Sequence, residues 1–148
     1  MSLTDRINAG IKDAMKAKDN ARKRTLRAVK AQLLLLQTSG EVEEITDAHE
    51  IKLIQKMVKE RQDSYEIYQK QGRDDLAQPE QEEMDILKEF LPKQMSTEEL
   101  TAEIKAIIEQ TGASSMRDMG KVMGAANKKF AGKADGKTIS SVVKDLLS

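Results

Sequence analysis

The sequence of 148 residues contains no cysteine and a single histidine, His49. The lack of cysteine excludes disulfides, thiolate nucleophiles, cysteine-based zinc sites and iron–sulfur clusters. A single histidine also excludes a histidine-rich metal site, and we expect no metal and no other cofactor. No apolar run exceeds the four leucines that begin at Leu33, so we expect no transmembrane span, no signal peptide and no membrane partner. Without a targeting segment, the predicted location is the cytoplasm.

The chain also has little proline, glycine and aromatic side chain, with two prolines, eight glycines and 3% aromatic residues. Charged residues make up 34% of the chain, and this composition favours helices over sheets. The scarcity of aromatic rings weighs against a surface on which unpaired bases stack. A length of 148 residues fits one domain, or one domain with a small second one.

Apolar residues recur at steps of three and four along the chain, which predicts amphipathic helices and no strand. Residues with N-cap chemistry precede four of these helices: Asp19, Thr46, Ser96 and Asp135. Pro79 fits the first turn of the fourth helix, and Pro92 ends it. The third helix, of roughly 26 residues, should run the length of a bundle. Its predicted buried face consists of Ile51, Ile54, Val58, Tyr65 and Tyr68.

We therefore predict an all-α protein with two parts. A four-helix N-terminal domain covers residues 1–95, and a small three-helix C-terminal tail domain covers residues 96–148. The segment Lys93–Met95 follows a proline and precedes a capping motif, so it is the predicted hinge. A joint there would let the small domain reorient.

The net charge of zero hides a strong segregation of charge along the chain. Between Arg6 and Lys30 there are nine basic and two acidic residues, whereas seven acidic residues and one lysine lie between Asp74 and Glu89. Two interpretations stay open: the two segments neutralise each other within the bundle, or the basic face contacts phosphates. At helical spacing, four cations of the second helix share this face: Lys23, Arg24, Arg27 and Lys30.

A second basic cluster, with six basic and two acidic residues, lies between Arg117 and Lys137. Within it, five lysines are candidate contacts for RNA phosphates: Lys121, Lys128, Lys129, Lys133 and Lys137. The loop that contains Gly132 and Gly136 precedes a helix, whose first N–H groups could hold a phosphate. Asp135 could instead cap those same donors.

Gly120 and Gly124 lie four residues apart within a predicted helix and therefore on one face. Glycine inside a helix is less favourable than alanine by about 1 kcal/mol, so something should approach this face closely. One interpretation is tight packing against a neighbouring helix. The other is the approach of an RNA backbone.

No catalytic constellation is evident in the sequence. His49 stands among acidic residues near the start of a helix, which is typical of a surface position. Ser114 and Ser115 precede a helix and fit a cap, and no glycine-rich phosphate-binding motif is present. We expect no catalytic residue and no intrinsic catalysis.

Three segments together resemble one known family. Residues 83–95 read EMDILKEFLPKQM, residues 118–124 read DMGKVMG, and residues 132–137 read GKADGK, followed by VVKDLL at 142–147. The chain resembles the YqeY-like proteins, which are similar to the C-terminal region of the GatB subunit of bacterial tRNA-dependent amidotransferases. The Ala134-Asp135-Gly136 turn is that of the stand-alone form. The resemblance covers essentially the whole chain and suggests a bacterial source.

This resemblance implies a non-catalytic helical module that binds tRNA or another folded RNA and is accessory to glutamine-dependent tRNA amidation. The association of the family with a glutamine-dependent carbon–nitrogen ligase derives from the larger subunit, and no residues of this chain support that activity. The alternative is a protein–protein interaction module that docks an amidotransferase or aminoacyl-tRNA synthetase subunit. The long third helix and the methionine-rich sixth helix would then form the docking surfaces.

Overall fold

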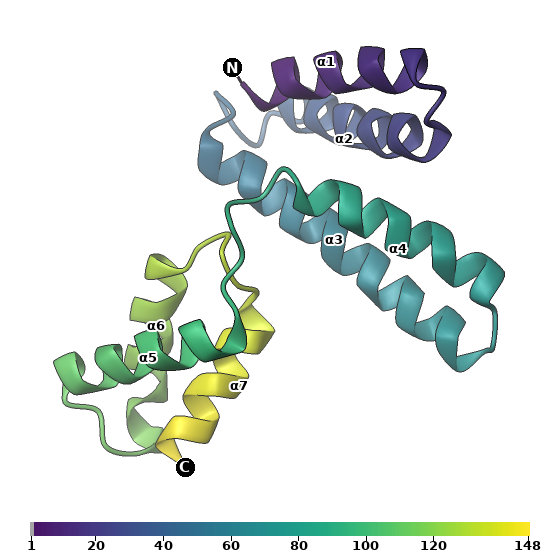
Figure 1. The fold of residues 1–148 in the computed structure, drawn as a ribbon. Helices are drawn as coiled ribbons and strands as arrows, with labels where there is room; N and C mark the ends of the chain where they lie inside the picture. Colours follow the sequence, from purple (N-terminus) through teal and green to yellow (C-terminus); the bar gives the residue numbers. More distant parts are fainter. Residues whose placement is uncertain (1) are drawn as a thin grey trace. The chain divides into compact units, whose positions relative to one another are not determined.

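The computed structural model describes residues 2–148, which form seven α-helices, one short 3-10 helix and no strand. The predicted all-α class is confirmed over this range. The chain divides into two compact units, one ending at Leu91 and one running over Pro92–Ser148, here called the N-terminal and C-terminal units. The first contains α1 (Leu3–Lys16), α2 (Asn20–Thr38), α3 (Asp47–Lys70) and α4 (Asp74–Lys88) (Figure 1). The second contains α5 (Thr97–Thr111), the 3-10 helix η1 (Met116–Asp118), α6 (Met119–Lys129) and α7 (Gly136–Leu147).

Local chemistry sets the start of four helices, as the sequence predicts. The side chains of Asp19, Thr46, Ser96 and Asp135 each accept a hydrogen bond from a backbone N–H in the first turn. Each therefore satisfies one donor that has no partner within its helix. The end of α5 is equally local, since Gly112 follows it with a left-handed φ of 69°.

The fourth helix begins earlier than predicted. Pro79 was expected in the first turn, but α4 starts at Asp74 and holds Pro79 in its interior. The proline leaves the carbonyl of Asp75 without its usual i→i+4 donor. Two acidic residues favour the earlier start because they lie at the positive end of the helix dipole. A two-fold hydrogen bond from Arg73 (3.0 and 2.9 Å) lowers the pKa of Asp75.

In the N-terminal unit, α1 and α2 form one antiparallel pair and α3 and α4 form another (Figure 1). All four helices contribute to one core: Leu3, Ile7, Leu26, Val29, Leu33, Ile54, Met57 and Leu87. The buried face predicted for α3 is only partly correct. Ile54 is buried together with Met57, whereas Tyr65 and Tyr68 remain half-exposed. Both core residues lie in the first half of α3, and its second half pairs with α4 (Figure 1).

A half-buried acid ties α1 to α3. The carboxylate of Glu50 accepts a hydrogen bond from the backbone N–H of Leu3 at 3.1 Å, at the start of α1. Partial burial raises the pKa of Glu50 because the charged form loses solvation.

The C-terminal unit has its own core, built from α5, α6 and α7: Leu100, Ile104, Ile107, Val122, Ala126, Phe130, Ile139, Val142, Val143 and Leu147. The segment predicted as a hinge is anchored to this unit. The N–H of Met95 donates to the carbonyl of Lys133 (2.9 Å), and the Gln94 amide donates to the carbonyl of Gly132 (2.7 Å). The compact units accordingly divide between Leu91 and Pro92, upstream of the predicted hinge.

Candidate nucleic-acid interface

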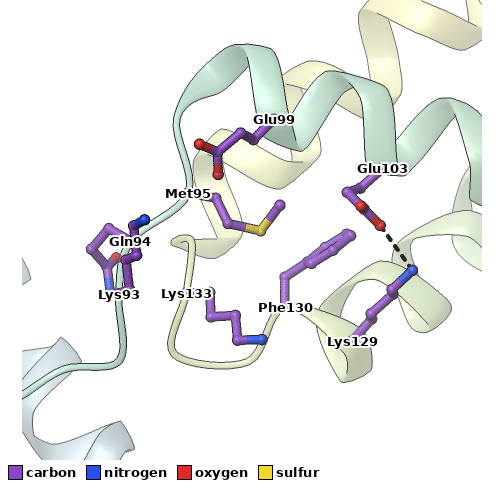
Figure 2. Close-up of a pocket in the computed structure, with 8 residues that line it drawn as sticks. All are labelled: Lys93, Gln94, Met95, Glu99, Glu103, Lys129, Phe130 and Lys133. Carbon is purple, nitrogen blue, oxygen red and sulfur yellow. Dashed lines mark hydrogen bonds and ion pairs between the residues drawn. The ribbon is translucent and has the colours of Figure 1, made fainter.

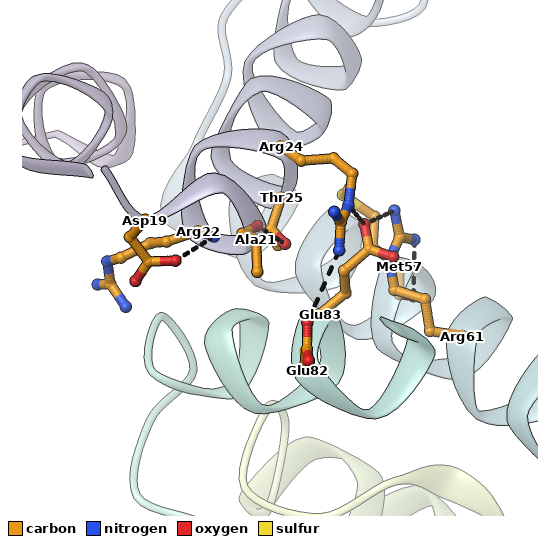
Figure 3. Close-up of polar contacts among 9 residues, drawn as sticks. All are labelled: Asp19, Ala21, Arg22, Arg24, Thr25, Met57, Arg61, Glu82 and Glu83. Atoms are coloured by element: carbon orange, nitrogen blue, oxygen red, sulfur yellow. Dashed lines mark hydrogen bonds and ion pairs between the residues drawn. The ribbon is translucent and has the colours of Figure 1, made fainter. Parts of the chain in front are cut away.

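The basic face of α2 is partly neutralised by the acidic helix α4. Arg24 lies 3.9 Å from Glu82 and 3.8 Å from Glu83 (Figure 3). Arg22 donates to both carboxylate oxygens of Glu89, at 2.7 and 3.3 Å, and this hydrogen bond raises the pKa of Arg22. Mutual neutralisation within the bundle therefore accounts for part of the charge segregation.

Three cations of the predicted N-terminal patch remain available. Over residues 2–148, no carboxylate lies within 4.0 Å of the charged groups of Lys23, Arg27 or Lys30. Arg27 and Lys30 are exposed, and Lys23 is half-exposed. The structure thus separates Arg24, which is paired with α4, from the other three.

The lysines of the C-terminal basic cluster also differ in their hydrogen-bond and ion-pair partners. Lys129 forms an ion pair with Glu103 at 2.9 Å and lies over the ring of Phe130 (Figure 2). Lys121 donates to the carbonyl of Thr111 at 3.1 Å and so satisfies an acceptor at the end of α5. An ammonium group has three N–H donors, so Lys121 keeps two for a ligand. Lys128 is exposed on α6, with no carboxylate within 4.0 Å in the described chain.

The glycines of α6 do not pack against another helix. Gly120 and Gly124 are exposed, and a Cβ atom built on either would meet no atom within 4 Å. The packing interpretation is therefore wrong for these two positions. Gly10 shows the contrast, because a Cβ atom there would lie 2.7 Å from a terminal carbon of the buried Leu26.

Helix α6 therefore carries an exposed strip with two cations and with two positions at which no side chain covers the backbone. The strip consists of Gly120, Lys121, Gly124 and Lys128 and is called the α6 face below. The opposite side of the helix carries Val122 and Ala126, both buried in the core. The strip contains two lysines and no acidic residue, and its two glycines leave the helix backbone accessible.

The loop before α7 favours the cap over a bound phosphate. The Asp135 carboxylate accepts from the N–H of Thr138 at 2.7 Å, and thus occupies a donor that an anion would need. Gly132 is buried with a φ of 79°, so its conformation disfavours any side chain. Lys133, Gly136 and Lys137 are exposed around this turn.

A pocket of about 380 Å³ lies beside this loop within the C-terminal unit (Figure 2). Its charged side chains nearly balance, because Glu99 and Glu103 stand among Lys93, Lys129 and Lys133. Such mixed charge does not distinguish a phosphate from other polar ligands. The α6 face is the more selective surface for a polyanion.

His49 has a structural role in capping α3. Its Nδ1 accepts from the N–H of Thr46 at 3.0 Å, while the Thr46 hydroxyl accepts from the N–H of His49. Over residues 2–148, no group of three or more metal-ligating side chains is placed to hold a metal ion. Within the same range, no helix is long and apolar enough to cross a bilayer.

Sequence reasoning missed an exposed leucine pair on α2. Leu34 and Leu35 are 59% and 60% exposed, although they belong to a run of four leucines. The run of four leucines itself indicates that some of them must be exposed. Four consecutive residues span about 300° around a helix, so one buried face cannot cover them all.

Comparison with known proteins decides the family. The Yqey-like protein family matches residues 4–147, nearly the entire chain. The chain belongs to the YqeY-like family. The resemblance inferred from the hinge and tail motifs is thereby confirmed.

Two curated fungal proteins are similar to this YqeY-like chain, and both are named Altered inheritance of mitochondria protein 41, mitochondrial. The one from Clavispora lusitaniae is 34% identical over 90 residues, covering 61% of this chain and 52% of that protein. The one from Pyrenophora tritici-repentis is 28% identical over 147 residues, covering 96% of this chain and 79% of that protein. The chain thus spans about half the length of the first relative.

These relatives correct the expected cytoplasmic location, because both are named as mitochondrial proteins. The expectation rested on the absence of a recognisable targeting segment, and such an absence does not assign a compartment. Both relatives come from fungi, so they also give no support to the bacterial source that the resemblance suggested.

Proposed function

We propose that this YqeY-like protein is a non-catalytic module that binds tRNA through the α6 face. The observation that carries the proposal is the exposed strip of Gly120, Lys121, Gly124 and Lys128, in which two helical glycines have no packing role. Glycine in a helix interior, as at Gly124, is less favourable than alanine by about 1 kcal/mol, and Gly120 in the first turn of α6 costs less than that. Close approach of a ligand backbone gives a physical reason for both.

The chemistry of the strip fits a phosphodiester backbone. Its lysines present ammonium donors to phosphate oxygens, and the glycines let a sugar–phosphate chain lie near the helix axis. Aromatic residues make up only 3% of the chain, so recognition would rest on the shape and backbone of a folded RNA. Lys133 and Lys137, which are exposed around the loop before α7, are further candidate phosphate contacts, while Lys129 contributes less because Glu103 pairs with it.

The role that accords with the family is accessory to glutamine-dependent tRNA amidation, with the reaction itself carried out by another protein. Lys23, Arg27 and Lys30 of the N-terminal unit would form a second phosphate-binding patch. We infer that the two units are separate domains, with four helices up to Leu91 and three α-helices from Pro92 onward. Each unit has a hydrophobic core made of its own residues, which supports this division.

The direct test is a titration of fluorescently labelled tRNA with the full chain, followed by anisotropy from about 50 to about 300 mM salt. We expect submicromolar affinity that a generic RNA duplex fails to compete away, with log affinity falling linearly against log salt. Weak binding that disappears at physiological salt, or full displacement by the duplex, would contradict the proposal.

The glycines of the α6 face allow a test that separates folding from binding. The double variant Gly120→Ala/Gly124→Ala should raise the free energy of unfolding by up to about 1 kcal/mol per site, because no atom obstructs the new methyl groups. The same variant should bind tRNA more weakly, since the methyl groups keep the RNA backbone away. Chemical denaturation and the anisotropy titration measure the two effects.

Gly10→Ala is the matched control for this pair. It should destabilise the N-terminal unit, because its methyl group meets the buried Leu26, and leave tRNA affinity unchanged. A more stable α6 variant with unaltered tRNA affinity would remove the glycines from the proposed contact.

A further inference from the structure

A groove of about 530 Å³ lies between the C-terminal end of α2 and the first half of α3, within the N-terminal unit. Leucine side chains from both helices line it: Leu35, Leu36 and Leu53. Leu35 is 60% exposed, and its neighbour Leu34 is 59% exposed. Contiguous exposed apolar side chains rimmed by polar groups are typical of surfaces that bind a partner.

Two cations stand along the α3 side of the groove. Lys52 and Lys56 are one helical turn apart and exposed, and no carboxylate lies within 4.0 Å of either ammonium group over residues 2–148. His49 adds a hydrogen-bond donor, because its Nδ1 accepts from Thr46 and a neutral ring then carries its proton on Nε2. Glu41, from the loop after α2, contributes the single lining carboxylate among the described residues.

We propose that this groove docks an amphipathic helix of a protein partner, with leucine-like side chains on one face and acidic residues beside them. Helices bind apolar grooves through anchors spaced at i, i+3, i+4 and i+7. Two carboxylates four residues apart on such a helix are about 6 Å apart along its axis. That spacing matches Lys52 and Lys56, which are also four residues apart on a helix. Charge complementarity therefore selects an acidic helix over a basic one.

The size of the surface argues for a single helix as the occupant. A stable dimer buries about 800 Å² on each partner. Two exposed leucines and the groove beside them fall well short of that area, so one short helix suits this surface better than a second copy of the chain. The proposal uses none of the cations assigned to RNA, so it stands or falls independently of the tRNA proposal.

The test is an NMR titration of the ¹⁵N-labelled full chain with a synthetic helical peptide. The probe peptide carries leucines at i, i+3, i+4 and i+7 and glutamates one turn apart. Two control peptides replace its glutamates by lysines or its leucines by alanines. We expect the probe to shift backbone resonances of the groove, and to bind at least about tenfold more tightly than either control, which is a difference of about 1.4 kcal/mol.

Variants of the chain sharpen the result. Lys52→Glu/Lys56→Glu should reverse the preference, so that the lysine peptide binds more tightly than the probe. Lys59→Glu/Lys70→Glu changes the same charge on α3 outside the groove and should leave the preference unaltered. Leu35→Glu should abolish probe binding with helical circular dichroism intact, since this side chain is already exposed.

Three outcomes would overturn the proposal. The first is equal affinity for the acidic and basic peptides, and the second is resonance shifts outside the groove. The third is a concentration-dependent dimer, seen by sedimentation, that Leu35→Glu dissociates, because the groove would then serve a second copy of the chain.

Discussion

Replacing Lys121 and Lys128 together by glutamate is expected to weaken tRNA binding about a hundredfold. A hydrogen bond to a charged group contributes about 1.5 kcal/mol at the low end, so two lost phosphate contacts amount to about 3 kcal/mol. Both lysines are exposed on the α6 face. The slope of log affinity against log salt should also fall, by roughly 1.4–1.8 for two contacts. The anisotropy titration measures both quantities.

The control must separate a local contact from the change in net charge. Lys105→Glu/Lys144→Glu makes the same change of charge on α5 and α7, at two exposed positions outside the α6 face. We expect it to weaken tRNA binding much less and to leave the salt slope nearly unchanged. Because Lys121 also donates to the carbonyl of Thr111, thermal unfolding of each variant must be recorded. Equal losses for the two double variants would mean that the α6 face is not the contact.

Phe130→Ala is expected to unfold the C-terminal unit and leave the N-terminal unit folded. The ring of Phe130 is 2% exposed within the core of α5, α6 and α7. Truncation of a buried phenylalanine lowers the free energy of unfolding by about 3–5 kcal/mol. A unit of this size has a total of roughly 3–9 kcal/mol, so most or all of its stability would be lost. Hydrogen exchange, resolved by residue, measures the stability of each unit separately.

Leu87→Ala is the mirror experiment in the N-terminal unit. Leu87 is fully buried in the other core, and its truncation lowers the free energy of unfolding by about 2–5 kcal/mol. Protection should then fall in α1 to α4 and persist in α5 to α7. Simultaneous loss of protection in both units, in either variant, would show one cooperative structure and would refute the division into two domains.

The positions of the helix caps follow from the sequence because the chemistry of a cap acts over a few residues. Asp19, Thr46, Ser96 and Asp135 each bond an N–H within their own first turn. The same reasoning placed the start of α4 wrongly at Pro79. Proline is favoured in the first turn of a helix, but its presence does not require the helix to start there. The acidic residues before it supply a competing local start, and α4 begins there.

The candidate site was only partly predictable from the sequence. The basic cluster between Arg117 and Lys137 is plain in the sequence, but its division into paired and unpaired lysines is not. Lys129 is neutralised by Glu103, which lies 26 residues earlier on α5. The surroundings of the predicted hinge are non-local in the same way, because Gln94 bonds the carbonyl of Gly132 across 38 residues.

Sequence alone determined the all-α class, the caps and the segregation of charge, since propensity and capping depend on neighbours along the chain. Tertiary structure alone decided which helical glycine lies against a neighbouring side chain and which faces open space. A Cβ atom built on Gly10 would meet Leu26, whereas one built on Gly120 or Gly124 would meet no atom within 4 Å beyond its own stretch of helix. It also decided which leucines of the run at 33–36 are buried, with Leu33 in the core and Leu35 largely exposed. The physical reason is that burial and ion pairing depend on which helix lies opposite, and that is a property of the packed fold.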